Sequence, residues 1–433
     1  MSEVIYEVPQ VKGRLNVQVE LPGSKSITNR VLLAAALADR PVRLRNVLFS
    51  DDSRHLMECL HTLGFKLDID ESVREVTVFG QGGQIPNQKA TINVGSAGTA
   101  ARFLTAMLAF GGGEYLVESS KQMMSRPMKP LLDGLRQLGV KFEFLGQPDC
   151  LPFRVDGSPV QGGRVLLRSN ISSQFLSAVL LAGCLSSGEF IIEIDGDVAA
   201  KPYIEMTLAM MRDFGVTVEN QSFQRFIIPA GQHYQGLDYA IEPDVSNASY
   251  FWAMAALTGG SVLVKGVKFN SLQGDIGILE ILKQLGCSVA EKAEGIEVRG
   301  PAEGQFPGIE ADLSGMPDQT MTLAALAPFA SSPTRIKNVG IIKFHESNRI
   351  RAILNELGKM GIRSEETDDG LIIYPGTPTA TAIETYDDHR MAMAFSLIGL
   401  RTPGMKIKNP GCTGKTFEGY FEYLDRIVAG MNG

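Results

Sequence analysis

Cations and hydroxyl groups recur where apolar segments of the sequence begin. A cation in the first turn of a helix opposes the helix dipole, and a buried apolar helix rarely needs one. Helix N-termini that converge on anions would use these groups, because N–H groups, hydroxyls and cations bind an anion together. The pattern predicts a phosphate or carboxylate site; the alternative for any single motif is an N-cap beside a solvated charge. The groups are Lys25, Ser26 and Arg30; Thr99 and Arg102; Ser172, Ser173 and Gln174; and His389 with Arg390.

Two glycine-rich stretches resemble nucleotide-binding loops only in part. Gly411–Thr416 reads GCTGKT, but Asn409 stands where a P-loop needs its first glycine. Gly80–Gly83 and Gly111–Gly113 do not spell GxGxxG. A nucleoside triphosphatase and a dinucleotide-binding protein are therefore disfavoured.

A metal site is also disfavoured. His389 has no second His or Cys at ligand spacing, and Asp387 with Asp388 fits a helix cap better than a metal cage. The five cysteines show no CxxC spacing, which argues against structural zinc and a disulfide framework. We expect no metal and no cofactor.

Composition restricts the class of protein. The chain has 433 residues, 44% of them hydrophobic and 21% charged, with a formal net charge of -7. Large buried cores are expected and general disorder is not. The acidic balance argues against a nucleic-acid or anionic-membrane partner, although a local basic pocket remains compatible with it. The first residues lack a signal-peptide pattern and Phe175–Leu185 is too short to span a bilayer, so we expect a cytoplasmic protein.

A repeated pattern accounts for much of the glycine. A helix, a Leu-Gly, Phe-Gly, or Met-Gly pair and a strand recur about 75 residues apart. Between these repeats lie Ala/Leu-rich segments that begin with polar residues. We predict about six α/β units in two domains, with the Ala/Leu helices central and buried; the alternative is an ordinary α/β protein with similar Gly-capped helices. The recurring glycines, each a predicted helix C′ residue, are Gly64, Gly139, Gly215, Gly286 and Gly361.

Eight motifs in order resemble one family, the 5-enolpyruvylshikimate-3-phosphate synthases. They are LPGSKSITNR (Leu21–Arg30), SAGTAAR (Ser96–Arg102), SRP (Ser125–Pro127), SSQFL (Ser172–Leu176), KPYIE (Lys201–Glu205), MPD (Met316–Asp318), DDHRMAM (Asp387–Met393) and CTGKTF (Cys412–Phe417). The resemblance implies a two-domain inside-out α/β barrel with three βαβαββ units per domain. It places 24–242 in an N-terminal domain on the 3-phosphoshikimate side, and 1–23 plus 243–433 in a C-terminal domain on the phosphoenolpyruvate side. The active site is expected in the cleft between them.

The implied reaction transfers the enolpyruvyl group of phosphoenolpyruvate to the 5-hydroxyl of 3-phosphoshikimate and releases phosphate. It belongs to the shikimate pathway, which leads to chorismate and the aromatic amino acids. Addition and elimination through a tetrahedral intermediate need one base, one acid and cations for the anionic groups. The expected partners are these two small molecules, with no nucleic acid and no membrane, and we expect a monomer.

The resemblance also implies roles for individual residues. Asp318 corresponds to the base, Glu346 to the carboxylate that exchanges protons at the methylene carbon, and Lys25 and His389 complete the catalytic set. The alternative for Asp318 is an N-cap of the following helix. The residues implied for 3-phosphoshikimate are Lys25, Ser26, Arg30, Ser172, Ser173, Gln174, Tyr203, Asp318 and His345. Those implied for phosphoenolpyruvate are Lys25, Gly98, Arg126, Gln174, Arg349, Arg390 and Lys415.

Four positions depart from the family pattern. His345 replaces a lysine, Ile341 an asparagine and Ala200 a frequent serine, while Phe103 follows Arg102 where proline or leucine is usual. Loss of the three polar contacts weakens 3-phosphoshikimate binding by about 0.5–1.5 kcal/mol each. We predict an affinity that falls as pH rises through the titration of His345. Gly98 leaves room beside the expected phosphoenolpyruvate site, so the resemblance implies inhibition by glyphosate. The strength of this inhibition depends on the departure at Phe103.

Two other functions are weighed against this one. The UDP-N-acetylglucosamine enolpyruvyl transferase shares the fold, but its lysine-asparagine start and loop cysteine are replaced here by Lys25-Ser26 and by Arg126. A non-catalytic binding paralogue would explain Ala200, Ile341 and His345. The presence of Asp318 together with Glu346 argues against it, because binding alone needs neither a base nor an acid.

Overall fold

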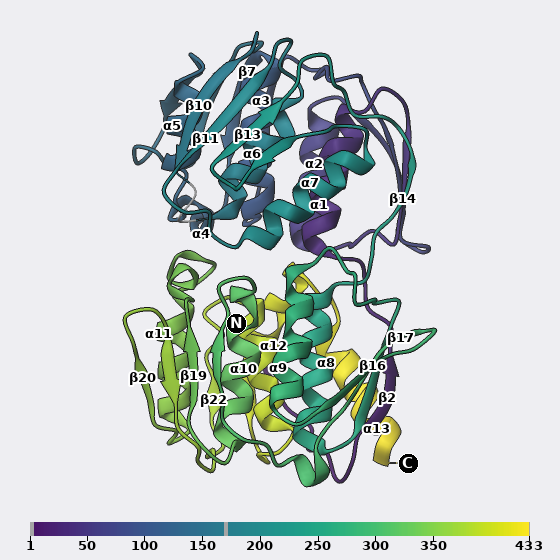
Figure 1. The fold of residues 1–433 in the computed structure, drawn as a ribbon, viewed down its shortest axis with the longest axis vertical. Helices are drawn as coiled ribbons and strands as arrows, with labels where there is room; N and C mark the ends of the chain where they lie inside the picture. Colours follow the sequence, from purple (N-terminus) through teal and green to yellow (C-terminus); the bar gives the residue numbers. More distant parts are fainter. Residues whose placement is uncertain (1–3, 169–171, 433) are drawn as a thin grey trace. The chain divides into compact units, whose positions relative to one another are not determined.

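The computed structural model describes residues 4–168 and 172–432 (Figure 1). Its contacts divide the chain into two compact units, Gly23–Ile241 on one side and Met1–Pro22 with Glu242–Gly433 on the other. We call them the 23–241 unit and the 242–433 unit. Residues 1–3 and 433, at the ends of the predicted C-terminal domain, lie outside the described residues, as do 169–171 before the SSQFL motif.

The strands described in the 23–241 unit form three four-stranded sheets. In each sheet the first two strands in spatial order run parallel and the remaining neighbours are antiparallel. The spatial orders are β14(Asp238–Ala240)-β3(Val42–Arg45)-β5(Glu75–Phe79)-β4(Lys66–Asp70), then β6(Lys89–Asn93)-β7(Gly113–Glu118)-β9(Phe153–Gly157)-β8(Lys141–Phe144), and β10(Gly163–Arg168)-β11(Phe190–Asp195)-β13(Arg225–Ile228)-β12(Glu219–Gln221).

The helices of this unit differ in burial as the sequence predicts. The helices α1(Lys25–Leu37), α3(Gly98–Gly111) and α6(Ser173–Gly183) bury nearly every residue. In contrast, α2(Asp51–Thr62), α5(Lys129–Arg136) and α7(Lys201–Asp213) each keep a polar face, and α4(Lys121–Met124) is a single short turn. The residues of the SKSITNR, GTAAR and SQFL motifs form the first turns of these three buried helices.

The 242–433 unit repeats the same sheet pattern among its described strands. The spatial orders are β2(Asn16–Val19)-β15(Ser261–Lys265)-β17(Gly295–Arg299)-β16(Ser288–Glu291), β18(Glu310–Asp312)-β19(Thr334–Lys337)-β21(Leu371–Ile373)-β20(Ser364–Glu366), and the shorter β22(Ala382–Ile383)-β23(Lys406–Lys408)-β1(Ile5–Glu7). Because β2 pairs in parallel with β15, the N-terminal segment contributes a strand to this unit.

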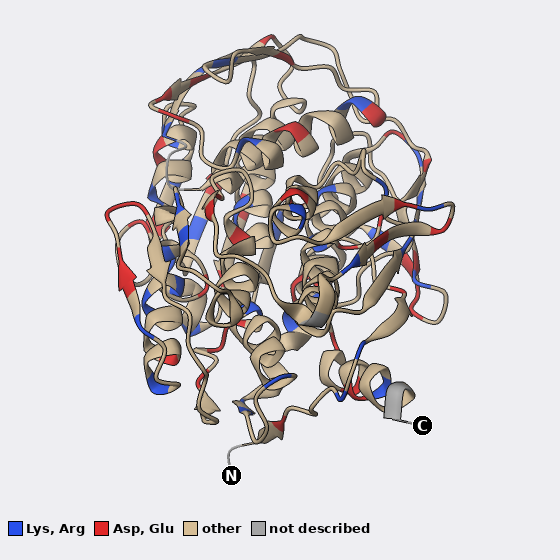
Figure 2. Cartoon of the chain, turned by 60° about the horizontal axis from the view of Figure 1, so that its bottom comes forward, with Lys and Arg blue, Asp and Glu red and all other residues tan. Residues whose placement is uncertain are grey.

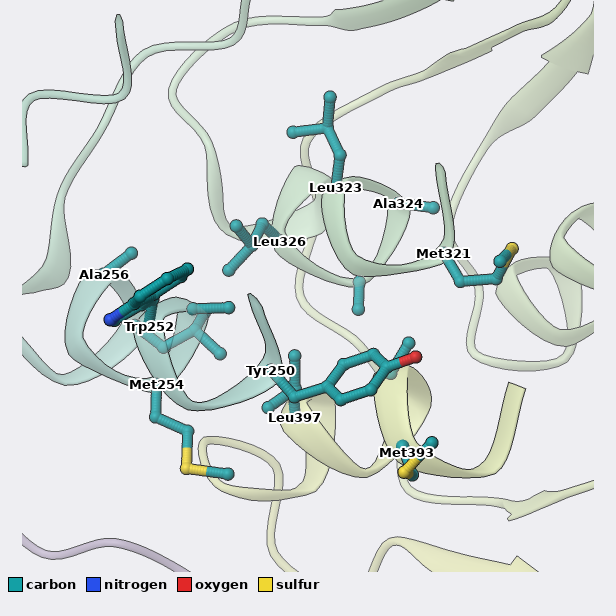
Figure 3. Packing of buried hydrophobic residues seen from close by; sticks show 14 of the residues in the cluster. Tyr250, Trp252, Met254, Ala256, Met321, Leu323, Ala324, Leu326, Met393 and Leu397 are labelled. Carbon is teal, nitrogen blue, oxygen red and sulfur yellow. The ribbon is translucent and has the colours of Figure 1, made fainter. Parts of the chain in front are cut away.

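Three buried helices form the centre of the 242–433 unit. They are α8(Val245–Thr258), α10(Thr320–Leu326) and α12(His389–Gly399), and Figure 3 shows their side chains in contact around Tyr250, Leu326 and Leu397. Trp252 is fully buried among them and donates its indole N–H to the Ile296 carbonyl at 3.3 Å. The remaining helices of this unit are α9(Ile278–Gln284), α11(Arg349–Lys359) and α13(Tyr420–Asn432), with 3-10 helices η1(Gly274–Gly277), η2(Ala302–Gly304), η3(Pro317–Gln319), η4(Ala327–Phe329), η5(Gly340–Phe344) and η6(Pro410–Lys415).

The mixed α/β class and the glycine-terminated helices predicted from the sequence are confirmed. All five recurring glycines have φ between +76° and +92°, the left-handed region that favours glycine. Four of them follow the C-cap residue directly, whereas Gly139 comes one residue later because α5 ends at Arg136 with Gln137 as its cap.

Charged residues are few in the central helices, where those present lie near the helix N-termini. Figure 2 shows them mainly on the outer strands, loops and amphipathic helices, and α6, α8 and α10 carry none. No helix within residues 4–168 and 172–432 is long and apolar enough to cross a membrane.

Candidate active site

The start of α1 places Lys25 against a buried carboxylate. Ser24 caps the helix by accepting the Ile27 N–H at 3.4 Å. The Lys25 Nζ atom lies 3.5 Å from Asp52 Oδ2, and their side chains are 13% and 4% exposed. Asp52 belongs to the first turn of α2, where a carboxylate is favoured by the helix dipole. The sequence motif identified Lys25 but not its partner.

Arg30 is fully buried one turn further along α1. Its guanidinium donates to Thr207 Oγ1 at 2.8 Å, to Ser177 Oγ at 3.1 Å and to the carbonyls of Ser26 and Tyr203. Since these partners are neutral, burial is not compensated by a carboxylate, and it lowers the pKa of Arg30 to about 10. Arg30 therefore brings positive charge into the interior and fixes the backbone beside the proposed substrate residues Ser26 and Tyr203.

A second cluster joins the starts of α3 and α6. Arg102 donates to Gln174 Oε1 at 2.9 Å and to the carbonyls of Gly98 and Pro127 at 3.0 Å. A methyl group added at Gly98 would lie 2.6 Å from a terminal nitrogen of Arg102 and of Arg126, so the absence of a side chain lets both guanidiniums approach. At α6, Ser172 accepts the Gln174 N–H at 3.3 Å, and Ser173 is buried.

Asp318 is the centre of a cluster of charged groups in the 242–433 unit. Its Oδ1 atom lies 2.7 Å from Arg349 Nη1, and its Oδ2 atom lies 2.7 Å from Arg390 Nη2. Burial raises the pKa of Asp318, but the charges of Arg390 and Arg349 outweigh burial and hold the pKa well below its ordinary range. The carboxylate faces these arginines, in contrast to the alternative of a helix N-cap.

Arg349 opens α11 and binds two further carboxylates. It donates to Glu346 Oε2 at 2.8 Å and to Asp388 Oδ2 at 2.8 Å. Burial alone would lower the pKa of Arg349, but Asp388, Glu346 and Asp318 together raise it. Lys415, at the end of η6, places its Nζ atom 3.8 Å from Glu346 Oε1. Three buried cations thus surround the two predicted catalytic carboxylates.

The start of α12 supplies another part of this cluster. Asp388 is the N-cap, as its sequence context predicts, and accepts the Arg390 N–H at 3.0 Å. His389 is fully buried with its Nδ1 atom 3.7 Å from Asp388 Oδ1. Arg390 Nη1 also lies 3.4 Å from the hydroxyl of Tyr250, whose pKa burial raises to about 12.

His345 lies in the same cluster with two competing contacts. Its Nδ1 atom is 2.9 Å from Arg349 Nη1 and 3.4 Å from Asp318 Oδ1. Because Arg349 is a donor, the first contact needs a lone pair on Nδ1, whereas the second needs a proton there. Ile341, the other departure in this segment, packs against the apolar core of the unit.

One buried carboxyl near this cluster was not anticipated from the sequence. Asp275 in η1 is 3% exposed and pairs with the Ser246 hydroxyl at the start of α8. Burial and the charge of Asp318 raise the pKa of Asp275 to about 6, against a lowering effect of Arg390. The surrounding sequence, QGDIG, matches no catalytic or binding motif, so this residue was not identified from the sequence.

The predicted residues thus gather within each unit. One set is Lys25, Ser26, Arg30, Gly98, Arg126, Ser172, Ser173, Gln174 and Tyr203; the other is Asp318, His345, Glu346, Arg349, His389, Arg390 and Lys415. Asp52 and Asp388 were not identified from the sequence as the carboxylates that contact the cations. Asp388 was recognised only as part of the DDHR motif and as a helix cap. Among the described residues no group of three or more His, Cys, Asp or Glu is placed to hold a metal ion.

These features define a class: an α/β protein that concentrates buried cations around carboxylates, as enzymes acting on small anions require. The family profile described as EPSP synthase (3-phosphoshikimate 1-carboxyvinyltransferase) matches residues 9–424. The chain belongs to this family.

Several known proteins are similar to this chain over nearly its whole length. The 3-phosphoshikimate 1-carboxyvinyltransferase of Nostoc sp. strain PCC 7120 is 46% identical over 421 residues, covering 97% of this chain and 99% of the relative. That of Vibrio atlanticus is 42% identical, covering 98% and 99%. The solved structure of EPSP synthase from Acinetobacter baumannii is similar with a TM-score of 0.81, at 25% identity and 98% coverage of both chains.

Proposed function

We propose that this chain is a 3-phosphoshikimate 1-carboxyvinyltransferase, which transfers the enolpyruvyl group of phosphoenolpyruvate to the 5-hydroxyl of 3-phosphoshikimate. Family membership supports the reaction, and one geometric observation carries the site: the Asp318 carboxylate lies between Arg349 and Arg390, with Glu346 and Lys415 in the same cluster. A base, a second carboxyl group and three cations are the groups that the reaction needs.

The 242–433 unit would supply the proton transfers. Asp318 accepts the proton of the 5-hydroxyl as the oxygen attacks the central carbon of phosphoenolpyruvate. Glu346 exchanges protons at the methylene carbon, with Lys25 and His389 assisting. The adduct then loses that proton again, its bond to the phosphate oxygen breaks, and phosphate leaves. The low pKa of Asp318 keeps the base ionised near neutral pH.

Cations of both units would hold the anionic groups. Arg390, Lys415, Arg349 and Arg126 are assigned to phosphoenolpyruvate, beside Gly98, Gln174 and Lys25. All three nitrogens of Arg349 already donate to carboxylates, so binding exchanges one of those contacts for the substrate. Protonation of Glu346 would release one, because a neutral carboxyl is a weaker acceptor.

The residues proposed for 3-phosphoshikimate lie mainly at helix starts of the 23–241 unit. Ser26, Ser172 and Ser173 supply hydroxyls and N-terminal N–H groups, which suit phosphate. Arg30 adds positive charge, and Tyr203 supplies a ring beside the substrate. Asp318 faces the 5-hydroxyl, and His345 takes the place of a family lysine.

Three finer statements belong to the same proposal. The buried helices surrounded by three sheets support an inside-out α/β barrel in each unit, with the N-terminal domain at 24–242 and the C-terminal domain at 1–23 plus 243–433. We also propose a cytoplasmic monomer that uses no metal or cofactor. We further propose that glyphosate competes at the phosphoenolpyruvate site, because Gly98 has no side chain to fill the space next to Arg102 and Arg126.

One assay tests the function. Purified protein is incubated with phosphoenolpyruvate, with and without 3-phosphoshikimate, and released phosphate is measured. We expect release only when both substrates are present. Absence of shikimate-dependent release would leave a binding paralogue, and dependence on UDP-N-acetylglucosamine would indicate the other enolpyruvyl transferase.

A further inference from the structure

The residues just before Asp388 adopt an unfavourable backbone conformation. Tyr386 and Asp387 have φ values of 56° and 54°. The left-handed region is uncommon for residues other than glycine and is least favourable for bulky side chains. Consecutive residues of this kind persist only where the surrounding structure holds them. The two residues lead directly into the N-cap of α12, and therefore into His389 and Arg390.

A fully buried carboxylate holds this turn from the side of α11. The hydroxyl of Tyr386 donates to Glu356 Oε1 at 2.7 Å, and the Glu384 N–H donates to Glu356 Oε2 at 3.1 Å. Lys359 Nζ lies 2.8 and 2.9 Å from the two oxygens and neutralises the charge. A carboxylate has about four acceptor sites, and Glu356 uses all of them.

The other contacts of the turn leave it little freedom. The Thr385 hydroxyl donates to the Lys408 carbonyl at 3.1 Å, and the Asn409 side-chain amide donates to Asp387 Oδ1 at 3.1 Å. On α11, Arg349 and Glu356 are seven residues apart and therefore share a face of the helix. Arg349 holds Asp388, whereas Glu356 holds the chain two to four residues earlier.

We propose that Glu356 and Tyr386 are positioning residues for enolpyruvyl transfer. Their hydrogen bond keeps residues 386–387 in the left-handed conformation. It thereby sets Asp388, which orients Arg349, and Arg390, which binds Asp318. This inference rests on the function proposed above. It gives a role to a buried carboxylate that the reaction itself does not use.

The first test replaces Tyr386 by Phe, which removes the hydroxyl and keeps the ring. We expect KM for phosphoenolpyruvate to rise about ten-fold, because displaced clamp residues lose aligned contacts. KM for 3-phosphoshikimate should stay within about two-fold, since its proposed ligands lie mainly in the 23–241 unit. Tyr374→Phe is the matched control, because Tyr374 packs on Arg363 and not on Glu356.

A second variant tests the carboxylate. Glu356→Gln keeps the shape but offers fewer acceptor sites, and we expect the same selective rise. The effects of the double variant with Tyr386→Phe should be smaller than the product of the two single effects, because both substitutions weaken the same contact between residues 356 and 386. Equal changes in both KM values, or effects that multiply in the double variant, would overturn the proposal.

Amide hydrogen exchange keeps this inference separate from the proposed function. Tyr386→Phe should speed exchange in residues 386–390 while exchange in α8 stays unchanged. Unchanged exchange at 386–390 refutes the positioning role whether or not the enzyme is active. An inactive wild-type protein in which the substitution accelerates exchange refutes only the proposed reaction.

Discussion

Two buried arginines, one in each unit, have opposite surroundings. Arg30 in the 23–241 unit donates only to hydroxyls and carbonyls in its described contacts, and burial lowers its pKa to about 10. Arg349 in the 242–433 unit binds Asp318, Glu346 and Asp388, which raise its pKa. The same side chain, equally buried, is thus left with its positive charge uncompensated in one unit and neutralised in the other.

The difference separates two tasks. A cation surrounded by neutral dipoles gains most when an anion arrives, which suits the binding of a phosphate ester. A cation that already holds three carboxylates organises a base and an acid instead. We infer that the 23–241 unit mainly binds 3-phosphoshikimate, and that the 242–433 unit performs the proton transfers and supplies most of the cations proposed for phosphoenolpyruvate.

The largest expected effect comes from removing the base. Asp318→Asn keeps the shape of the side chain but cannot take a proton from the substrate hydroxyl. We expect kcat to fall by about 10²–10⁴-fold, while binding of 3-phosphoshikimate changes much less. Steady-state kinetics and calorimetry measure the two quantities. A folded variant with near-normal turnover would show that Asp318 is not the base.

The contrast between the two arginines predicts unequal effects on stability. Arg349→Gln leaves three buried carboxylates without their common partner and should cost about 3–5 kcal/mol of unfolding free energy. Arg30→Gln leaves only neutral groups and should cost about 1–3 kcal/mol. Urea unfolding followed by Trp252 fluorescence reports the 242–433 unit, where this tryptophan is buried, and far-UV circular dichroism reports both. Equal losses of unfolding free energy in the two variants would contradict the contrast between Arg30 and Arg349.

The sequence predicted the repeating architecture better than the partners of the charged groups. Glycine positions and apolar helices follow from local backbone and burial preferences, so Gly64 and Gly361 could be assigned from spacing alone. The contact between Asp388 and Arg349 joins residues 39 positions apart, and that of Lys25 with Asp52 joins two helices. Neither pairing leaves a periodic signal. Asp275 could not be identified as a buried titrating group, because its surroundings come from several segments.

Asp275 provides a sharper test of the electrostatics of the 242–433 unit. Its folded pKa of about 6 exceeds the ordinary value of about 3.9. Between these values the folded chain keeps a proton that the unfolded chain has lost. Its contribution to stability is therefore complete below about pH 4 and is lost as pH rises through 6, a change of about 3 kcal/mol.

The variant Asp275→Asn removes this titration. We expect the unfolding free energy of the wild type to fall relative to that of Asp275→Asn as pH rises from 4 to 7. Asp318 does not interfere, because its lowered pKa confines its own effect to pH below about 4. Urea unfolding at several pH values measures the difference. A difference that stays constant with pH would show that Asp275 does not hold a proton in the folded chain.

The smallest expected effect concerns His345, whose Nδ1 atom lies near both Arg349 and Asp318. The family pattern places a lysine at this position, whose ammonium group carries a full positive charge and three donors. We predict that His345→Lys raises 3-phosphoshikimate affinity about two- to ten-fold, because it adds one charge-assisted contact for this substrate.

His345→Gln is the matched control, because its amide keeps a polar group at this position and adds no charge. Calorimetry with 3-phosphoshikimate compares the wild type and both variants at one pH. We expect His345→Lys to bind more tightly than His345→Gln, and we expect this difference to shrink at high salt, because salt screens the added charge. Equal affinities of the two variants at low and at high salt would show that His345 acts only by holding Arg349, and that the absence of the family lysine does not weaken binding.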